Sequence, residues 1–198
     1  MSDVSLRRPW IRTASIGVAL LALAGCGHSG NSVATSAKTT APSASWSPAP
    51  AAPPNPQTLL RAAALAVAQV PDGTLTFIRS DTADTGTWKV RVVTNEGTEQ
   101  QVKIGADGRT VLVGPTPRND SEADKARHRD LVRAAHLDYR AAVNKVLAVV
   151  SDGSITELKL DKEDGTTVWD ADVYDTHLVE HNVEIDATSG DLVSNKQD

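Results

Sequence analysis

The chain has 198 residues, of which 40% are hydrophobic and 23% are charged, and its formal net charge at pH 7 is −5. This acidic balance argues against nucleic acid as a partner, because phosphate backbones attract basic surfaces. The chain holds one cysteine, so it cannot close a disulfide on itself and its stability must come from packing.

The first 25 residues have the features of an export signal. An apolar run at 16–25 is too short to span a bilayer comfortably and fits the apolar part of a signal peptide. The run ends in the letters LAGC, and the cysteine of this group, Cys26, is the single cysteine of the chain. Three arginines precede the run: Arg7, Arg8 and Arg12.

This ending resembles the lipobox of bacterial lipoproteins. The resemblance implies cleavage between Gly25 and Cys26, transfer of a diacylglyceryl group to the Cys26 sulfur, and acylation of the freed amine with chains such as palmitate. We therefore expect a protein anchored by lipid on the extracytoplasmic side of a cell membrane. The alternative is an ordinary signal peptide followed by an unpaired cysteine, and the sequence leaves open whether the membrane is inner or outer.

Residues 26–56 are predicted to be a disordered tether behind the lipidated cysteine. Of the 30 residues at 27–56, 24 are Ala, Ser, Thr, Pro or Gly, and Lys38 carries the one charge. Such a composition buries too little apolar surface to offset the entropy lost on ordering. Loss of residues 1–25 would leave 17 basic and 24 acidic residues, a net charge of −7.

Residues 57–117 are predicted to form a helix followed by strands. Asn55 can cap the helix, Pro56 suits its first turn, and the letters PDG at 71–73 end it. Alternating apolar residues then predict strands, with Trp88 in the core. The expected strands are 75–79, 87–93, 99–104 and 110–113.

Residues 138–198 are predicted to repeat this order. Asp138 is the candidate N-cap of a helix at 136–150, which the letters SDG end. The expected strands are 154–160, 166–174, 177–185 and 192–193. The landmarks of the two repeats recur 79 to 82 residues apart: RAA at 61–63 and 140–142, Trp88 and Trp169, Gly108 and Gly190.

We therefore predict an α+β fold in which one unit, a helix packed on a small antiparallel sheet, occurs twice. Single units of this size are marginally stable, so two units can share a buried interface. The segment 118–137 between them is expected to be a largely solvated connector with a helix after Ser121.

The repeat resembles the PepSY domain, most clearly in the second copy. There the letters RAAVNKVL, SDGSITELKL, VWDADVY and VEIDATSGDLV match the family pattern, whereas VKIGADGRTVLV in the first copy matches loosely. In the matching turn, Asp186 is expected to bind backbone donors and Gly190 to supply a positive φ. PepSY domains occur in propeptides that restrain thermolysin-like proteases, so the resemblance implies binding or inhibition in the cell envelope and supplies no catalytic residue.

Two histidines of the second repeat could belong to a ligand or metal site. His177 and His181 stand four apart in the predicted strand and would share one face, with Asp175 or Asp172 as a further ligand. The alternative is a pair of hydrogen-bonded or half-exposed histidines at the end of a sheet.

Acidic residues also gather in the second repeat. Residues 138–198 hold 14 acidic and five basic residues, a net charge of −9, whereas residues 57–117 hold six of each. Four of the acids are expected to form an outward stripe that meets a basic partner or loosely collects cations, and the alternative is an acidic face that is only solvated. Together with the histidines, the candidate binding residues are Asp170, Asp172, His177, Glu180, His181 and Glu184.

The leading functional hypothesis is a non-enzymatic lipoprotein of the cell envelope that binds or restrains an exported protein, with a protease as one candidate partner. No nucleophile–base pair, phosphate-binding loop or closed metal motif occurs in the sequence, so no catalytic residue, metal or cofactor is assigned. Aromatic residues form 4% of the chain, which favours a moderate binder over a very tight inhibitor. The alternatives are a ligand- or metal-binding module that uses the second repeat, and a structural spacer.

Overall fold

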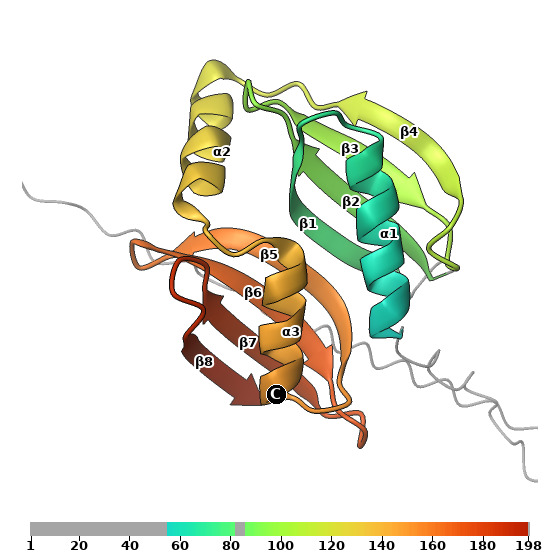
Figure 1. The fold of residues 1–198 in the computed structure, drawn as a ribbon, viewed down its shortest axis with the longest axis vertical. Helices are drawn as coiled ribbons and strands as arrows, with labels where there is room; N and C mark the ends of the chain where they lie inside the picture. The colour runs from blue at the N-terminus through green and yellow to red at the C-terminus, as the bar shows by residue number, and fades with distance from the viewer. Residues whose placement is uncertain (1–54, 82–85, 198) are drawn as a thin grey trace, which may run out of the picture. The chain divides into compact units, whose positions relative to one another are not determined.

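The computed structural model describes residues 55–81 and 86–197 (Figure 1). The predicted signal peptide, the lipidation site at Cys26 and nearly all of the predicted tether lie outside the described residues. Residues 48–198 form one compact unit, and one hydrophobic core runs through both repeats. The predicted division at 57–117, 118–137 and 138–198 stays a prediction.

The order of one helix and four strands occurs twice, which confirms the predicted α+β fold. A third helix, α2 (Glu122–Ala134), stands between the two repeats. Repeat 1 consists of α1 (Pro56–Ala68), β1 (Thr74–Asp81), β2 (Thr87–Val93), β3 (Glu99–Ile104) and β4 (Val111–Pro117). Repeat 2 consists of α3 (Tyr139–Val149), β5 (Ser154–Glu163), β6 (Thr166–Tyr174), β7 (Glu180–Asp186) and β8 (Leu192–Gln197).

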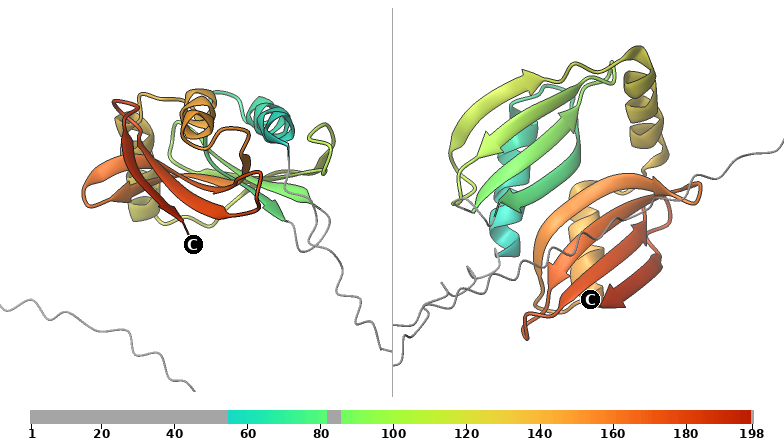
Figure 2. Two further views of the ribbon diagram at one scale, coloured as in Figure 1. Left: turned by 90° about the horizontal axis from the view of Figure 1, so that it is seen from below. Right: turned by 180° about the vertical axis from the view of Figure 1, so that it is seen from behind.

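The eight strands form one sheet in the order β4-β3-β2-β1-β5-β6-β7-β8. Every neighbouring pair is antiparallel. The two small sheets that the repeat suggests are therefore joined through β1 and β5. Helices α1 and α3 lie on the same side of this sheet, and the opposite side carries neither of them (Figure 2).

The joint between the repeats has a local two-fold symmetry. Ile78 in β1 pairs with Leu158 in β5, and these two residues stand 80 positions apart, at the offset of the repeat. The flanking pairs, Phe77 with Lys159 and Arg79 with Glu157, also exchange equivalent positions. The first strand of each repeat therefore pairs with its own counterpart.

Alternation along the strands places the core under the helices. In β2, Trp88, Val90 and Val92 are fully buried, and their partners across the sheet lie on the same face. In repeat 2, Trp169 is equally buried, and its Nε1 donates to the Leu137 carbonyl at 3.0 Å. The prediction that Trp88 lies in the core is confirmed. Every second strand residue is buried because successive side chains of a strand point to opposite faces of the sheet.

The helix starts follow the predicted caps. The Asn55 side chain accepts a hydrogen bond from the Gln57 amide at 2.7 Å, and the Asp138 side chain accepts one from the Ala141 amide at 2.8 Å. Each cap satisfies an N–H group that the first helical turn leaves without a partner. With Asp138 as its N-cap, α3 begins at Tyr139, three residues after the predicted start at residue 136.

Two predicted strands have different bounds in the structure. The run at 110–113 is the start of a longer strand, β4, which continues through Pro115 to Pro117. This is possible because β4 lies at an edge of the sheet, where a missing N–H need not break a ladder. The predicted strand at 177–185 begins only at Glu180, because the preceding residues form a turn.

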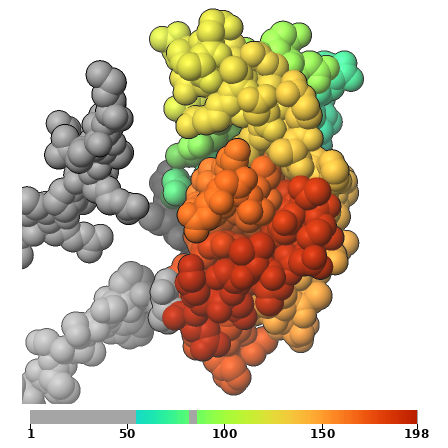
Figure 3. Space-filling view, turned by 90° about the vertical axis from the view of Figure 1, so that its left-hand side faces the viewer, coloured from blue at the N-terminus to red at the C-terminus, as the bar shows by residue number. Residues whose placement is uncertain are grey.

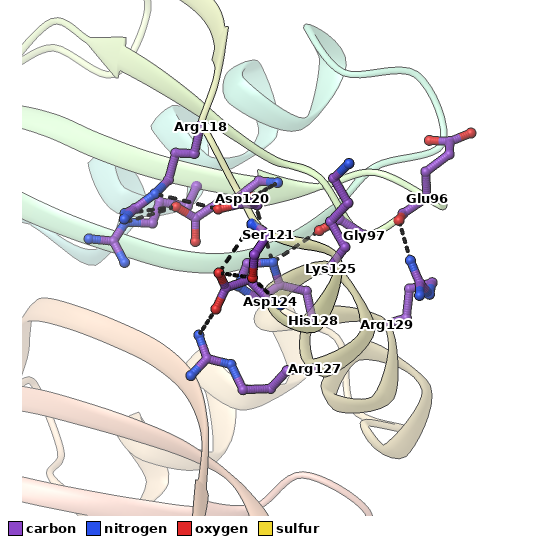
Figure 4. Close-up of polar contacts among 12 residues, drawn as sticks. Glu96, Gly97, Arg118, Asp120, Ser121, Asp124, Lys125, Arg127, His128 and Arg129 are labelled. Carbon is purple, nitrogen blue, oxygen red and sulfur yellow. Dashed lines mark hydrogen bonds and ion pairs between the residues drawn. The ribbon is translucent and has the colours of Figure 1, made fainter.

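Helix α2 is tied to repeat 1 at its N-terminal half (Figure 4). Ser121 and Asp124 form a reciprocal capping box. His128 Nδ1 lies 3.0 Å from the Gly97 carbonyl oxygen in the β2–β3 turn. Gly97 has φ +89, and a Cβ atom there would lie 2.2 Å from the Lys125 carbonyl oxygen. This turn therefore needs glycine both for its backbone angle and for its contact with α2.

The C-terminal end of α2 is tied to repeat 2. The Thr188 hydroxyl donates to the Ala134 carbonyl at 3.1 Å. The amides of His136 and Leu137 donate to the Ala187 carbonyl at 2.8 and 2.9 Å. None of the residues of α2 is fully buried, which fits the expected solvated connector, but its two ends fix it to both repeats.

Candidate protein-binding face

The side of the sheet opposite α1 and α3 carries most of the charged strand residues. We call this side the open face, and it consists of the strand residues that alternate with the core residues. Two rows of paired residues cross it from β3 to β7. One row is Gln101, Arg91, Phe77, Lys159, Asp170 and Glu184. The other row is Lys103, Lys89, Arg79, Glu157, Asp172 and Asn182.

The two repeats carry opposite charges at three equivalent positions of the open face. With an offset of 81 residues, the offset of the buried tryptophans, Lys89 corresponds to Asp170 and Arg91 to Asp172. By the same offset, Lys103 corresponds to Glu184. At these three positions the open face is basic over β2 and β3 and acidic over β6 and β7, whereas Glu99 in β3 and its counterpart Glu180 in β7 are both acidic.

Like charges stand directly opposite each other in both repeats. Lys89 pairs in register with Lys103 in repeat 1, and Asp170 pairs with Glu184 in repeat 2. Cross-strand pairs of like charge reduce the stability of a sheet. The fold alone does not require either arrangement, because uncharged side chains would fit the same positions.

A small polar network holds the acidic side chains of repeat 2 in place. The Asn182 amide donates to Asp170 Oδ1 at 2.7 Å and to Asp172 Oδ1 at 3.2 Å. Lys159 Nζ lies 3.5 Å from Asp170 Oδ2, and Lys196 Nζ lies 3.8 Å from Glu184 Oε1. The network fixes the carboxylates and compensates part of their charge. Glu180 lies on the same face of β7. We call the four acids of β6 and β7 on this face, Asp170, Asp172, Glu180 and Glu184, the acidic stripe.

The edge of the acidic stripe at the joint contains a further carboxylate. Glu157 Oε2 lies 3.4 Å from Arg79 Nη1 of repeat 1. Burial raises the pKa of Glu157, and the neighbouring charge of Asp172 acts in the same direction, whereas Arg79 opposes both. At the other end, a hydrogen bond with Glu180 raises the pKa of its cross-strand partner Tyr174.

The structure separates the two candidate histidines. His177 is exposed in the turn before β7, where the Asp175 side chain accepts hydrogen bonds from the His177 and Val179 amides at 2.8 and 2.9 Å. Leu178 in this turn has φ +62. The expectation that both histidines share a strand face is therefore wrong, because the Asp175 turn delays the start of the strand.

His181 lies on the core side of β7 and is 6% exposed. Its Nδ1 is 3.2 Å from Asn195 Oδ1, and its Nε2 is 3.6 Å from Asp175 Oδ2. Within residues 55–81 and 86–197, no group of three or more His, Cys, Asp or Glu side chains is placed to hold a metal ion. His181 therefore joins β7 to β8 and to the preceding turn, and it does not reach the acidic stripe.

The acidic stripe itself lies as the sequence predicts, on neighbouring strands and on one face. Sequence reasoning missed the residues that organise it: Glu157, Lys159, Asn182 and Lys196. Which acids these residues contact depends on the register of the β5–β6 and β7–β8 hairpins. The alternation of apolar and polar residues in the sequence does not determine that register.

The closing turns of the two repeats confirm the predicted geometry. The Asp186 side chain accepts from the Thr188 and Ser189 amides at 2.7 and 2.9 Å. Gly190 has φ +79, and Gly108 in repeat 1 has φ +71. These residues therefore hold turns, and the Asp186 carboxylate is engaged by amides of its own turn.

The described part of the chain contains no helix that is long and apolar enough to cross a membrane. No curated protein matches the sequence. A comparison with solved structures matches a "putative lipoprotein" from Clostridium difficile, at 17% identity and a TM-score of 0.42. The alignment covers 64% of this chain and 84% of the other, and a likeness at this level carries no argument about function.

A family model supports the predicted resemblance for repeat 2. The model of PepSY, described as a peptidase propeptide and YPEB domain, matches residues 138–195. The match covers α3, β5, β6, β7 and nearly all of β8, and does not extend to repeat 1. PepSY domains are generally non-catalytic. The match to the PepSY model thus lies at residues 138–195, which is less than half of the chain.

Proposed function

We propose that this protein is a lipid-anchored binding protein of the cell envelope, on the extracytoplasmic side, which binds an exported protein through the acidic stripe of repeat 2. The main support is that Asp170 pairs with Glu184 on the open face. The equivalent residues in repeat 1, Lys89 and Lys103, are both basic. A like-charge pair that weakens the sheet is accounted for if a basic surface of a partner neutralises it on binding.

Two further observations support this proposal. The sequence around Cys26 resembles a lipobox, which would place the protein outside the cytoplasm and on a membrane. The PepSY model that matches repeat 2 is described as a peptidase propeptide domain. An exported protease with a basic surface is therefore the partner class that fits best, and the bound state would restrain it.

A pair of charge reversals tests the proposal. The soluble fragment 48–198, as wild type and as Asp172→Lys with Glu184→Lys, is incubated with exported proteins and with secreted proteases. A matched control carries Asp130→Lys with Glu163→Lys, which changes net charge equally at two exposed positions off the acidic stripe. Thermal unfolding of all three proteins checks that each remains folded.

The proposal predicts that the wild type and the control capture the same protein and slow the same protease. The stripe variant should lose both effects, because it places positive charge opposite a basic surface. Equal capture by all three proteins would refute the acidic stripe as the binding surface. Failure of the wild type to bind or slow any exported protein would refute the function.

A further inference from the structure

The two outer strands of the sheet, β4 and β8, occupy equivalent positions in the two repeats. Each contains an exposed Leu-Val pair, Leu112 and Val113 directly after the first residue of β4 and Leu192 and Val193 at the start of β8. These four side chains are between 49% and 52% exposed. Both edges therefore present apolar side chains that a further strand could cover.

The backbone of β4 is poorly suited to accept another strand. The Leu-Val pair is followed there by Gly114, Pro115, Thr116 and Pro117. The two prolines have no N–H group to donate, and proline at an edge is a common means of preventing strand addition. Lys103, which pairs with Val113, adds positive charge beside this edge.

The backbone of β8 is suited to accept one. Its Leu-Val pair is followed by Ser194, Asn195, Lys196 and Gln197, all of which keep their N–H groups. In the described part of the chain, β8 pairs only with β7. Its residues are exposed apart from Ser194, and repeat 2 lies open on this side of the molecule (Figure 3). One edge of β8 thus retains unpaired backbone donors and acceptors.

The charge around β8 selects the chemistry of an added strand. Ser194 pairs with Glu184 of the acidic stripe. Because serine is short, a lysine or arginine of an added strand opposite Ser194 can extend over it toward the Glu184 carboxylate. A second copy of this chain would instead bring together two repeats that each carry a net charge of −9 over residues 138–198. Charge complementarity therefore favours a basic segment over self-association.

We infer that β8 is the docking edge for an extended basic segment of the protein partner, which adds to the sheet as a ninth strand beside β8. Backbone hydrogen bonds would supply affinity, and basic side chains on the open face would supply specificity. This inference rests on the proposed function and names the part of the partner that the second repeat recognises.

Titration with synthetic peptides tests the inference on fragment 48–198. The first probe is the capped heptapeptide Thr-Lys-Val-Lys-Val-Lys-Thr. The second has glutamate in place of each lysine. The third keeps the lysines but is N-methylated at alternate residues, which removes the donors along one edge. Backbone amide shifts in NMR spectra locate binding, and sedimentation of the fragment alone reports self-association.

The lysine peptide should shift the amides of residues 192–197 and leave those of residues 111–114 and 116 unchanged. Both other peptides should bind at least about tenfold more weakly, because one loses charge attraction and the other loses two or more backbone hydrogen bonds. Val193→Lys should weaken binding of the lysine peptide to a similar degree, since a lysine on an edge strand opposes strand addition. The matched change Leu112→Lys, at the equivalent exposed position of β4, should leave binding unaltered.

Four outcomes would overturn the inference: equal binding of the N-methylated peptide, shifts confined to β4, dimerisation of the fragment through β8, or no shift with any peptide. The charge-reversal experiment separates these failures from failure of the proposed function. Capture of a partner through the acidic stripe without strand addition would refute the docking edge alone. Strand addition without any exported partner would refute the proposed function alone.

Discussion

The two repeats share a backbone plan and differ in what they present to solvent. Both place a buried tryptophan in the second strand, a positive-φ glycine in the closing turn, and a helix over the same side of the sheet. Their open faces carry opposite charges, and only repeat 1 has prolines in its outer strand. Positions that determine the backbone have been kept, whereas the exposed positions have diverged.

This difference suggests a division of roles. Repeat 1 completes the shared core and closes one edge of the sheet with prolines. Repeat 2 carries the acidic stripe, the open edge and the PepSY match. The pairing of Ile78 with Leu158 joins the two into one sheet, so that stability is shared while the proposed binding surface lies on one side of the joint.

The largest expected effect comes from breaking the joint. Ile78→Ala and Leu158→Ala each remove a fully buried side chain at the β1–β5 pairing and should lower the free energy of unfolding by about 2–5 kcal/mol. Leu112→Ala, at a half-exposed position of the edge strand β4, should cost less than about 1 kcal/mol. Denaturant unfolding followed by tryptophan fluorescence measures all three.

Because the core is continuous, each joint variant should still unfold in one transition that includes Trp88 and Trp169. A second transition, in which one tryptophan becomes exposed before the other, would mean that the repeats are stable independently.

A second prediction concerns the attachment of α2 to repeat 1. Gly97 and Gly165 have nearly the same positive φ, +89 and +90, but only Gly97 has a backbone atom within 4 Å of an added Cβ. Gly165→Ala should therefore cost about 1–2 kcal/mol for backbone strain alone. Gly97→Ala should cost about 2 kcal/mol more, because Lys125 must move with α2. Thermal unfolding gives both values, and equal values would contradict the contact.

The third prediction compares the closing turns. An added Cβ at Gly108 would lie 2.7 Å from the Thr58 carbonyl oxygen in α1, whereas at Gly190 it would meet the side chains of Lys145 and Leu137 at 3.1 and 3.2 Å. Flexible side chains can move and helix backbone cannot, so Gly108→Ala should be the more destabilising by about 1 kcal/mol. Denaturant midpoints measure the difference, and the reverse order would show that repeat 2 has the tighter turn.

The smallest effect concerns pH. Hydrogen bonds from the Ser189 and Thr188 amides lower the pKa of Asp186, whereas in repeat 1 the Gly108 amide donates to the Gly105 carbonyl, which does not titrate. A lowered folded-state pKa contributes stability above the unfolded value, and this is lost as pH falls through the folded pKa. Below about pH 4, the β7–β8 turn should therefore lose amide protection before the β3–β4 turn.

Hydrogen exchange at Ser189 and Gly108 follows the two turns separately. Asp186→Asn should remove the pH step at Ser189, because the amide does not ionise in this range. Loss of protection at the same pH in both turns would point to a cause other than Asp186.

Local features of this fold could be predicted from sequence, whereas non-local pairings could not. The caps Asn55 and Asp138 and the turn residues Asp186 and Gly190 act within a few positions of themselves, so their residue types suffice. The pairing of Ile78 with Leu158 joins residues 80 positions apart, and no pattern within either strand specifies it. The single eight-stranded sheet therefore emerged only in the structure.

The candidate site was predictable in part for the same reason. Strand alternation places Asp170, Asp172 and Glu184 on one face, and the repeat offset exposes their charge inversion. The prediction for His177 was wrong because the Asp175 side chain binds two nearby amides and forms a turn. An aspartate at this place in the sequence favours such a turn, but the alternating apolar pattern favoured a strand. The contacts of Asn182 and Lys159 depend on register and needed the structure.

The central claim is that partner binding belongs to repeat 2 and not to the equivalent surface of repeat 1. Lys196 and Thr116 test it most directly, because they occupy equivalent exposed positions opposite Asn182 and Gln101. A photoreactive residue is placed at each position in turn, in the full chain in its own membranes, and crosslinked proteins are identified by mass spectrometry. If repeat 2 binds the partner, an exported protein is crosslinked from position 196 and none from position 116. Equal crosslinking from both positions, or crosslinking from position 116 alone, would contradict it.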